Sequence, residues 1–551
     1  MRRTVFSSGF FLFSCLATGN ASAALAASSD AAEIQELRRE MVAMRRELMG
    51  QISSLKVRLA KSEARTNRNN QKKIAALAAP LPATELSEQK VRHVVSGPSD
   101  PAIKFSDSAS QYNILRLSEI GTPPSDRGVV ESWKHFHWAT QKDENVRVGG
   151  MIIGFPRGRF TIASADAAYA FSVGLALHED IGGFFGMSPR PGETKGNFPG
   201  LTQNLRRLRL PVSFRYKNWI ANVTPDWGSS SSDGKVSLYE ANINYTGFSH
   251  TYVTVGYFQP RVTFYDSQSS NNFQMLERPG ITNIVRNIAA GDSRFSAGAL
   301  HYEKRWWIAG YFTGQSYGTR GNDSTVSDSQ TGATLRVAGR PYISKNVDIH
   351  VGISALSAFK TTQNSAGRRY SPGEATEAGL TGTKLISATV SNTGPVWAAG
   401  PELGLRWRRL IMIGEYYHIG VQRSERGLPV VNFDGYYGEA TYTILGKPRA
   451  YDIRQGAFSA PGVEADFDPQ HGQWGALEVS GRYSVADLND LSAGIRGGKQ
   501  TVWAGGVNWY PNRHFRVMLD YNHFIVTRNQ LPYNISGRNG NSVVTRLQAA
   551  F

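Results

Sequence analysis

The chain has 551 residues, of which 40% are hydrophobic, 11% are aromatic and 56 are glycine, so it can bury a large apolar core and is not a disordered protein. Its formal net charge is +17, and its single cysteine, Cys15, lies near the start. The rest of the chain therefore excludes disulfides and thiolate metal sites, and the basic charge favours anionic partners.

The first residues, MRRTVFSSGFFLFSCLATGNASA, predict a secretory signal peptide over 1–23. Two arginines open the segment, an apolar stretch follows, and the small-residue motif ASA closes it. Cleavage before Cys15 with acylation is an alternative that the bulky Phe13 disfavours. Because an exported protein rarely meets nucleic acid, we expect anionic solutes or lipopolysaccharide as partners, and no nucleic acid.

Residues 31–63 are predicted to form a coiled-coil helix, in which apolar residues recur at intervals of three and four with one stutter. This stripe is narrower than the face of a helix packed on a globular core, so we favour an oligomerisation coil over a lone amphipathic helix. The polar, Ala/Pro-rich residues 64–100 are expected to be a linker. The apolar positions of the coil are Ile34, Leu37, Met41, Met44, Leu48, Ile52, Leu55 and Leu59.

From about residue 101 the apolar pattern changes to a period of two, which is typical of strands with one apolar and one polar face. In SLYEANINY, Ile243 and Tyr245 alternate with Asn242 and Asn244. The same alternation recurs in GYYGEATYTIL, in LEVSGRYSV and in the two segments that flank the turn YPNRH. Such strands fit either a large soluble sandwich or a membrane barrel.

Three features favour the barrel. Charged residues of both signs lie on the polar faces, as a water-filled lumen requires, and a closed barrel leaves no strand edge exposed to lipid. Aromatic residues recur near strand ends, as at a membrane interface, at Trp306, Trp307, Trp407, Tyr416, Tyr417, Tyr436, Tyr437 and Tyr510. Short turns alternate with long polar segments that we expect to be external loops, at 361–383, 422–434, 449–472 and 527–541.

The prediction is therefore an all-β fold: a transmembrane antiparallel β-barrel over residues 101–551, preceded by the α-helical coiled coil. Segment counting gives about fourteen to eighteen strands, and about 16 strands suit a barrel with an aqueous lumen. The last segment, VVTRLQAAF, fixes the phase of its strand. Leu547 and Phe551 are predicted to face lipid, and Arg546 is predicted to face the lumen.

Several stretches together resemble the phosphate-selective porin O and P family. They are VTVGYFQPRVTFYDSQSSNNFQMLERPGI, GYYGEATYTILG, GALEVSGRYSVADLND, GGKQTVWAGGVNWYPNRHFRVMLDYNH and the terminal LQAAF, in that order over 205–551, with a looser likeness over 101–204. The resemblance implies a homotrimer of sixteen-stranded barrels in the outer membrane of a Gram-negative bacterium, surrounded by lipid and lipopolysaccharide. It also implies passage of small anions such as phosphate and chloride, no cofactor, a coil in the periplasm, and a terminal Phe551 that the barrel-assembly machinery recognises.

By the same resemblance, an inward-folded loop that constricts the pore covers about 259–294, after the strand that ends in VGYFQP. Its candidate anion-lining residues are Arg261, Arg278, Arg286 and Arg294. Guanidinium groups there would replace part of an anion's hydration by charge-assisted hydrogen bonds. Glu277 has a structural alternative, as a loop anchor paired with Arg278.

A second candidate set lies on a wall strand in QNLRRLRLPVSFRYK, where one face carries Arg207, Arg209 and Arg215. These arginines could lead anions toward the constriction, and further lumen-phase candidates are Arg147, Arg336, Arg406, Arg482 and Arg516. The structural alternative is that most of them pair with lumen carboxylates. The carboxylates considered were Glu240, Glu402, Glu478 and Asp520.

The resemblance implies that phosphate specificity in this family depends on a central lysine cluster. Residues 259–294 contain no lysine. General anion selectivity is therefore the better expectation, with a sugar or organic-solute porin as the alternative. A coiled-coil-anchored surface adhesin or outer-membrane enzyme is the third hypothesis. The sequence has no phosphate-binding glycine loop with lysine and no His-Glu-x-x-His, and although a Ser/His/Asp site assembled from distant strands stays open, we expect no enzyme. His135 and His137 in WKHFHW lack a third ligand nearby, so no metal site is expected.

Overall fold

The computed structural model describes residues 145–148, 151–155, 159–164, 168–187, 198–228, 235–318, 330–361, 363–364, 367–530 and 533–551. The chain divides into two units, 1–96 and 97–551, and all described residues belong to the second unit. The predicted signal peptide, coiled coil and linker, and the histidines of WKHFHW, lie outside the described residues. No helix within the described ranges is long and apolar enough to cross a membrane.

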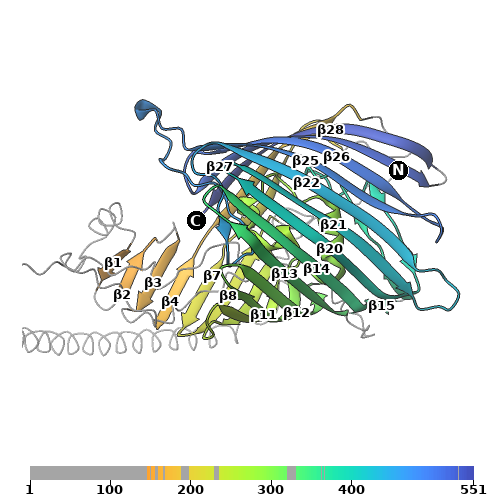
Figure 1. Cartoon of the computed structure of the whole chain (residues 1–551), viewed down its shortest axis with the longest axis horizontal. Coiled ribbons are helices and arrows are strands. Elements are labelled where there is room, and N and C mark those ends of the chain that lie inside the picture. Colours follow the sequence, from red (N-terminus) through yellow and green to blue (C-terminus); the bar gives the residue numbers. More distant parts are fainter. Residues whose placement is uncertain are drawn as a thin grey trace, which may run out of the picture. The chain divides into compact units, whose positions relative to one another are not determined.

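Sixteen described strands form one closed antiparallel circuit, which is the barrel wall (Figure 1). The circuit closes where the last strand pairs with the first, with Leu547 opposite Glu179. In hydrogen-bonded order the strands are β5 (Ala176–Phe185), β6 (Thr202–Arg209), β8 (Trp219–Asp226), β9 (Ser237–Tyr245), β10 (Thr251–Phe258), β11 (Arg294–Tyr302), β12 (Trp306–Ser316), β13 (Thr331–Ile343), β14 (Val347–Lys360), β20 (Thr393–Trp407), β21 (Leu410–Arg423), β22 (Val431–Leu445), β25 (Ala476–Asp490), β26 (Ile495–Tyr510), β27 (Phe515–Gln530) and β28 (Tyr533–Ala550). The predicted strand number is confirmed.

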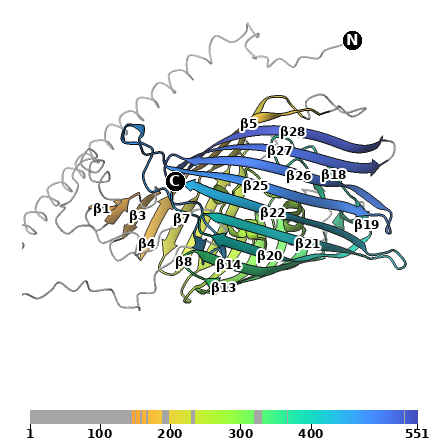
Figure 2. The ribbon, with the colours of Figure 1, turned by 45° about the horizontal axis from the view of Figure 1, so that its top comes forward.

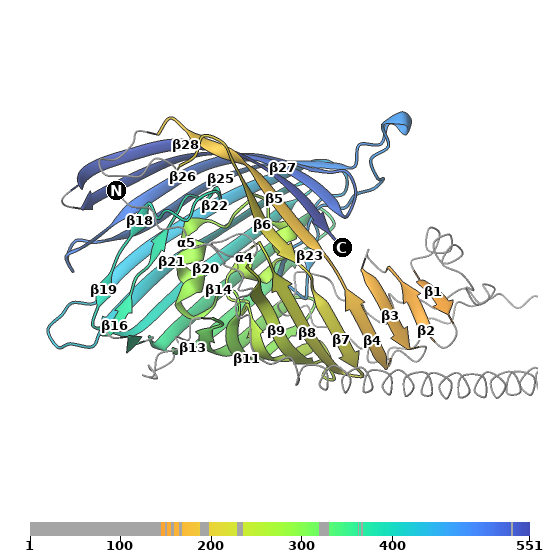
Figure 3. The same cartoon turned by 180° about the vertical axis from the view of Figure 1, so that it is seen from behind.

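Five shorter strands extend the wall beyond the circuit, beside β8 (Figure 3). Their order is β1-β2-β3-β4-β7, and β7 then pairs with β8. Pro211 interrupts the segment between β6 and β7, because proline has no N–H to donate to a ladder. The five are β1 (Asn145–Val148), β2 (Met151–Gly154), β3 (Phe160–Ser164), β4 (Tyr169–Val173) and β7 (Val212–Tyr216).

On many of the strands apolar and polar side chains alternate, and the apolar ones point outward. On β9, Ile243 is 54% exposed while its neighbours Asn242 and Asn244 are buried. On β28, Leu547 is 47% exposed and Arg546 is buried, as the terminal motif predicted. An apolar exterior is what a barrel surrounded by lipid requires, and the interior is polar along these strands but apolar on β21, where Ile411, Ile413 and Ile419 are buried.

The predicted aromatic belt is only half right. Trp306 and Trp307 are neighbours on a strand, so the first faces outward and the second is buried inside. The same alternation turns Tyr417 and Tyr437 inward, where both hydroxyls donate to Glu415. Tyr510 is also buried. The outward members of the predicted set are Trp306, Trp407, Tyr416 and Tyr436.

The long strands of the wall run side by side in Figure 2, and their connections divide between two ends. Short turns lie at the end that also holds the C-terminus, at 303–305, 344–346, 408–409 and 511–514. Segment 446–475, which contains the predicted external loop 449–472, lies at this short-turn end because β22 runs toward it. Most of the predicted loop 527–541 belongs to β27 and β28. Polar composition predicted both as external loops, but strand direction, and not composition, decides the end at which a connection lies.

Residues 259–293 fold back into the barrel, where α4 (Phe264–Ser267), η2 (Ser270–Asn272) and α5 (Gly280–Ala289) lie (Figure 3). The apolar side chains of α5, among them Ile281, Val285 and Ile288, are buried in the core that they share with the wall. Because α5 contacts six wall strands, from β13 to β25, it lies within the barrel and not on its surface.

Two further connections carry short strands of their own. Residues 361–392, at the same end as 259–293, contain β15 (Gln363–Asn364), β16 (Gly367–Tyr370), β17 (Gly373–Glu374), β18 (Ile386–Ser387) and β19 (Val390–Ser391). Residues 446–475, at the short-turn end, contain β23 (Tyr451–Asp452), β24 (Ala457–Phe458) and η3 (Pro469–His471).

Candidate functional site

The candidate site is the charged interior of the barrel. There, arginines of the last strands donate hydrogen bonds to the backbone carbonyls of segment 259–293. Arg516 of β27 donates to the carbonyl oxygens of Asn271 (3.0 Å) and Phe273 (2.6 Å). Arg546 of β28 donates to the carbonyl of Leu276 at 2.7 Å. Inward parity on these strands places the guanidinium groups where the backbone of the loop needs donors.

Acceptors of the wall satisfy backbone N–H groups of the same loop. The Asp520 carboxylate accepts from the Leu276 N–H at 2.7 Å, and the Glu415 carboxylate accepts from the Phe264 N–H at 2.9 Å. A buried loop backbone is tolerated only when its polar groups are paired, so these wall residues account for how an irregular segment lies inside the barrel.

Glu277 lies between two wall arginines. Its carboxylate accepts two hydrogen bonds from Arg206, at 2.8 and 3.0 Å, and one from Arg546 at 2.8 Å. Arg546 also forms a bidentate ion pair with Asp180 of β5, with N···O distances of 2.6 and 2.7 Å. Burial opposes ionisation of Glu277, but the charges of Arg206 and Arg546 outweigh it and hold the pKa of this carboxyl well below its ordinary value. Arg278, its predicted partner, instead lies 3.6 Å from Asp266.

Arg206 reaches the interior through a β-bulge. The β5–β6 register pairs His178 with Arg207 and then Glu179 with Leu205, so Arg206 has no opposite residue. Such a bulge lets two successive side chains point to the same side. Strict alternation therefore missed Arg206; the double arginine in QNLRRLRL is the only hint that the sequence offers.

The four arginines predicted for segment 259–294 are buried and occupied within that segment or next to it. Arg261 donates to the Ser267 carbonyl at 2.7 Å, and Arg294 donates to the Gly314 carbonyl at 2.8 Å. Arg286 pairs with Asp266 and with Asp292, each at 2.7 Å. Arg278 lies over the ring of Phe273, 4.9 Å from its centre, in addition to its approach to Asp266.

The arginines of β6 and β7 differ in their partners. Arg209 pairs with Asp226 at 2.6 Å and stacks on Tyr239, and Arg215 donates to the Lys217 carbonyl. Arg207 donates to Nδ1 of His178 at 3.1 Å. Among the described residues, no carboxylate lies within ion-pair distance of Arg207.

His178 connects this arginine to the loop. Its Nε2 lies 2.8 Å from the side-chain oxygen of Asn271, while its Nδ1 accepts from Arg207. This pattern requires a neutral imidazole that donates through Nε2. The positive charge beside Glu277 thus includes Arg206, Arg207 and Arg546, against the carboxylates of Glu277 and Asp180.

The lumen carboxylates considered as partners behave differently from one another. Glu402 pairs with Arg336 at 2.8 Å, as the pairing alternative expected, and Glu478 pairs with Arg449 at 2.7 Å. Glu240 accepts from the hydroxyl of Thr224 at 2.9 Å. Among the described residues, Arg406 donates to backbone carbonyls alone, and Arg482 pairs with Glu377 at 2.7 Å. The side chain of Arg147 lies outside the described part of the chain.

Residues 449–458 enter the barrel from the short-turn end, which the sequence did not predict. The indole N–H of Trp307 donates to the Arg454 carbonyl at 3.0 Å. Arg336 donates to the Gly456 carbonyl at 2.8 Å and, with its other terminal nitrogen, to the Ser267 hydroxyl of α4 at 2.6 Å. One guanidinium therefore contacts both inward segments.

Loop 361–392 contacts α5 through two glutamates. Glu377 accepts from the Gly280 N–H at 2.7 Å, at the start of the helix, and Glu374 accepts from the Asn283 side chain at 3.1 Å. Burial raises the pKa of Glu374 to about 8; the bond from Asn283 opposes this rise and the charge of Glu377 adds to it.

The buried charges of the described residues comprise fourteen arginines, twelve carboxylates and no lysine, an excess of two positive charges when all are ionised. The arginines are Arg159, Arg207, Arg209, Arg215, Arg261, Arg278, Arg286, Arg294, Arg336, Arg449, Arg454, Arg482, Arg516 and Arg546. The carboxylates are Asp180, Asp226, Glu240, Asp266, Glu277, Asp348, Glu377, Glu402, Glu415, Glu439, Glu478 and Asp520.

Comparison with known proteins adds four matches. The family model described as phosphate-selective porin O and P matches residues 171–551. Porin O of Pseudomonas aeruginosa is 22% identical over 488 residues, covering 80% of this chain and all of the relative. Two solved structures also match: the outer membrane channel DcaP of Acinetobacter baumannii (10% identity, TM-score 0.41, 70% of this chain and 98% of that one) and an anion-selective porin from Comamonas acidovorans (10% identity, TM-score 0.40, 70% and 100%).

Proposed function

The chain belongs to the phosphate-selective porin O and P family, and from this premise we propose that it is a channel for passive diffusion that favours small anions. It is an outer-membrane porin barrel of a Gram-negative bacterium. The observation that carries the anion preference is Arg207, which lies on the inner wall beside Arg206 and has no carboxylate partner among the described residues.

Anions are favoured because this part of the wall keeps uncompensated positive charge. The side chain of Arg206 is 27% exposed, although its guanidinium is bonded to Glu277, so solvent reaches Arg206; Arg207, next to it on the strand, is buried and acts on the path through its charge. A guanidinium presents several N–H donors in a plane, which suits chloride as well as the oxygens of phosphate. Weak sites of this kind let an ion enter and leave.

The four loop arginines have another role in this proposal. Since Arg286 is bound by two carboxylates and Arg261 and Arg294 by carbonyls, they shape segment 259–294 as the constriction and do not line the ion path. Glu277, held by Arg206 and Arg546, anchors the constriction to the wall. General anion selectivity is preferred to phosphate specificity, because no lysine is among the buried side chains of the described residues.

A sugar porin would need inward aromatic side chains along the path. The inward tyrosines Tyr417 and Tyr437 are buried and donate to Glu415, so they offer no exposed ring face to a sugar. The anion channel therefore has more support than the sugar channel, and a channel function has more support than an adhesin or an enzyme.

Assembly is part of the proposal. We expect homotrimers, with the coil 31–63 in the periplasm and lipid with lipopolysaccharide around the barrel. The ring of Phe551 stacks on His514 at 4.8 Å, and its backbone pairs with Leu175, so the terminal residue is part of the wall that the assembly machinery would recognise. Deletion of 31–63 should reduce the trimers captured by cross-linking; trimers that persist would assign trimer formation to the barrel alone.

The test is the reversal potential of the full chain in planar bilayers under a KCl gradient. The wild-type channel should be anion-selective, and Arg207→Gln should lower the anion-to-cation permeability ratio roughly two- to fivefold, because one positive charge is lost from the wall beside the path. Arg426→Gln, an exposed arginine of the connection 424–430, is the matched control and should leave the ratio unchanged.

Three outcomes separate the parts of the proposal. A cation-selective wild-type channel would contradict the anion preference. An unchanged permeability ratio in Arg207→Gln would contradict the role of Arg207 alone. Chloride conductance that is insensitive to millimolar phosphate would exclude phosphate binding and leave general anion selectivity standing.

A further inference from the structure

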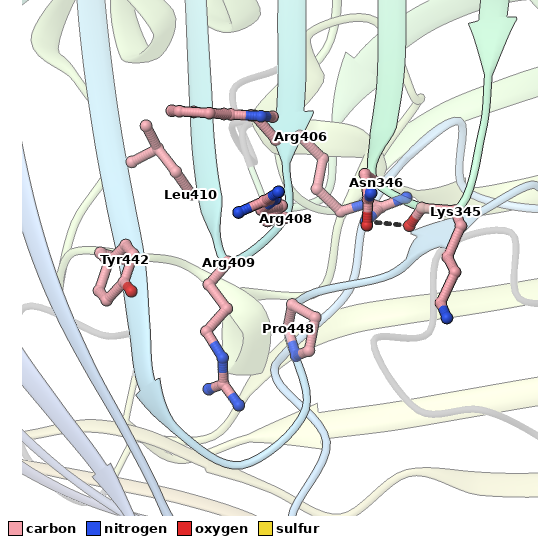
Figure 4. Close-up of a pocket in the computed structure, with 9 residues that line it drawn as sticks. Lys345, Asn346, Arg406, Arg408, Arg409, Leu410, Tyr442 and Pro448 are labelled. Carbon is pink, nitrogen blue, oxygen red and sulfur yellow. Dashed lines mark hydrogen bonds between the residues drawn. The ribbon is translucent and has the colours of Figure 1, made fainter.

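A basic pocket lies on the rim of the barrel at the short-turn end, away from the charged interior. Its volume is about 720 Å³. Figure 4 shows the side chains that line it. The turns 344–346 and 408–409 and the start of segment 446–475 form it. The lining residues are Lys345, Asn346, Arg406, Trp407, Arg408, Arg409, Leu410, Tyr442 and Pro448.

The pocket contains four cationic side chains and no carboxylate. Arg406 donates to the carbonyls of Lys345 (3.3 Å) and Ser344 (3.4 Å), and Arg409 donates to three carbonyls, the shortest being that of Gly446 at 3.0 Å. Carbonyl groups orient these guanidinium groups without neutralising them. The side chains of Lys345 and Arg408 have no hydrogen-bond or ion-pair partner within the described residues.

The acid that could neutralise the pocket is engaged elsewhere. Asp348 stands opposite Arg406 in the β14–β20 register. Its carboxylate pairs with Arg340 on the neighbouring strand. The pocket therefore keeps its positive charge.

The turns that carry the cations are tied together. The Arg408 N–H donates to the Asn346 carbonyl at 2.6 Å, which holds the two turns side by side. Arg408 itself has φ 55°, in the left-handed region that favours glycine or asparagine.

The other side of the pocket is apolar and faces outward. Trp407 is 54% exposed and Tyr442 is 47% exposed, and Leu410 lies between them in the strand pairing. Beyond them the outward side chains Leu403 and Met412 continue the apolar surface of β20 and β21. Tryptophan and tyrosine at this level are typical of the boundary between lipid and water.

We propose that this pocket binds the phosphodiester headgroup of an anionic phospholipid, phosphatidylglycerol or a lipid of the same chemistry, in the periplasmic leaflet. This proposal rests on the outer-membrane placement, in which short turns face the periplasm. Guanidinium and ammonium groups contact the phosphate oxygens, and the acyl chains lie along the outward faces of β20, β21 and β22. A soluble anion would use only the cationic half of the pocket; a phospholipid uses both halves.

The experiment counts phospholipids bound to the full-length protein by native mass spectrometry from detergent, with phosphatidylglycerol and phosphatidylcholine as probes. The variant is Lys345→Gln with Arg408→Asn, which removes the two cations without partners and keeps a residue that tolerates positive φ. Lys217→Asn is the matched control, because Lys217 has φ 51° in another two-residue turn at the same end but lines no such pocket.

The wild-type protein should retain phosphatidylglycerol at least tenfold better than phosphatidylcholine, and the double variant should lose that preference while the control keeps it. Equal retention of both lipids by the wild-type protein, or an unchanged preference in the double variant, would overturn the proposal. An equal loss in the control would assign the effect to general basic charge and would also overturn it.

Two further measurements complete the test. Inorganic phosphate at millimolar concentration should not displace the lipid; displacement would mean that the pocket is a site for soluble anions. The reversal potential of the double variant should match that of the wild-type channel, since the pocket lies outside the interior. A cation-selective channel with intact lipid preference would contradict the proposed function and leave the lipid site standing.

Discussion

The arginines inside the barrel fall into two groups, in the loop and on the wall, that differ in where their partners lie. Arg286 in the loop reaches Asp266 and Asp292, all within one segment. Arg546 on the wall reaches Asp180 at the other end of the barrel sequence and Glu277 in the loop. Both arginines are buried and paired, so burial alone does not distinguish them.

This difference indicates that one set of contacts determines the fold of the loop and another set attaches the loop to the barrel wall. Pairs within the segment fix how the loop folds, whereas pairs from β25 to β28 fix where it lies in the barrel. Removing a wall arginine should therefore cost more than removing a loop arginine, because it also leaves charges of two other elements unpaired.

The largest effect is expected for Arg546→Met. It leaves the buried carboxylates of Asp180 and Glu277 without this partner, and loss of one member of a buried ion network typically costs ~3–5 kcal/mol. Urea unfolding of the refolded barrel in lipid vesicles measures the change. Arg546→Lys, which keeps the charge but not the planar fork, should lose less. Equal stability of the methionine variant and the wild-type barrel would refute the attachment role.

A smaller effect is expected for Arg286→Gln, which loosens the loop and leaves its attachment intact. Because Arg278 remains near Asp266, we expect a cost of about 1–3 kcal/mol. Hydrogen exchange should accelerate in 259–293 and remain unchanged in β27. Single-channel recordings should show more current noise. Faster exchange throughout the barrel would mean that the loop and the wall do not behave as separate parts.

The smallest effect concerns pH and the contact of loop 361–392 with α5. Burial raises the pKa of Glu374 to about 8, so the carboxyl stays protonated in the folded protein while its unfolded counterpart ionises from about pH 4.5. Because the pKa of Glu374 is higher in the folded than in the unfolded protein, its contribution to the free energy of unfolding is complete at low pH. That contribution declines as pH rises toward 8.

Since Glu374 is only half-buried, we expect a decline of about 1 kcal/mol between pH 5 and pH 8.5. The decline should be absent in Glu374→Gln. Urea midpoints of the two proteins at both pH values give the comparison. A decline of the same size in the glutamine variant would assign it to other groups.

The period-two pattern predicted most of the wall, because burial on one face of a strand dictates the alternation of its residues. It placed Arg546 and Asn242 inside and Leu547 outside, and the structure confirms these positions. It was wrong at adjacent aromatic pairs such as Trp306 and Trp307, where both residues were assigned to the belt.

The partners inside the barrel could not be predicted from local patterns. Glu277 and Arg546 are 269 residues apart, and nothing around either residue indicates the other. Arg206 turns inward only because of a bulge, and segment 446–475 enters from the short-turn end although its composition resembles that of an external loop. Long-range pairing and strand direction are properties of the closed barrel as a whole.

Arg336 connects the two segments that enter the barrel from opposite ends. Its terminal nitrogens hold Ser267 of the segment that enters from one end and Gly456 of the segment that enters from the other, while Glu402 fixes its Nε. A shift of either segment along the barrel axis would therefore break its hydrogen bond to Arg336 or displace the hydrogen bond of Arg336 to the other segment. Arg449 of the second segment also donates directly to the Asn272 carbonyl of the first at 2.6 Å, so the two inward segments form one connected unit inside the barrel.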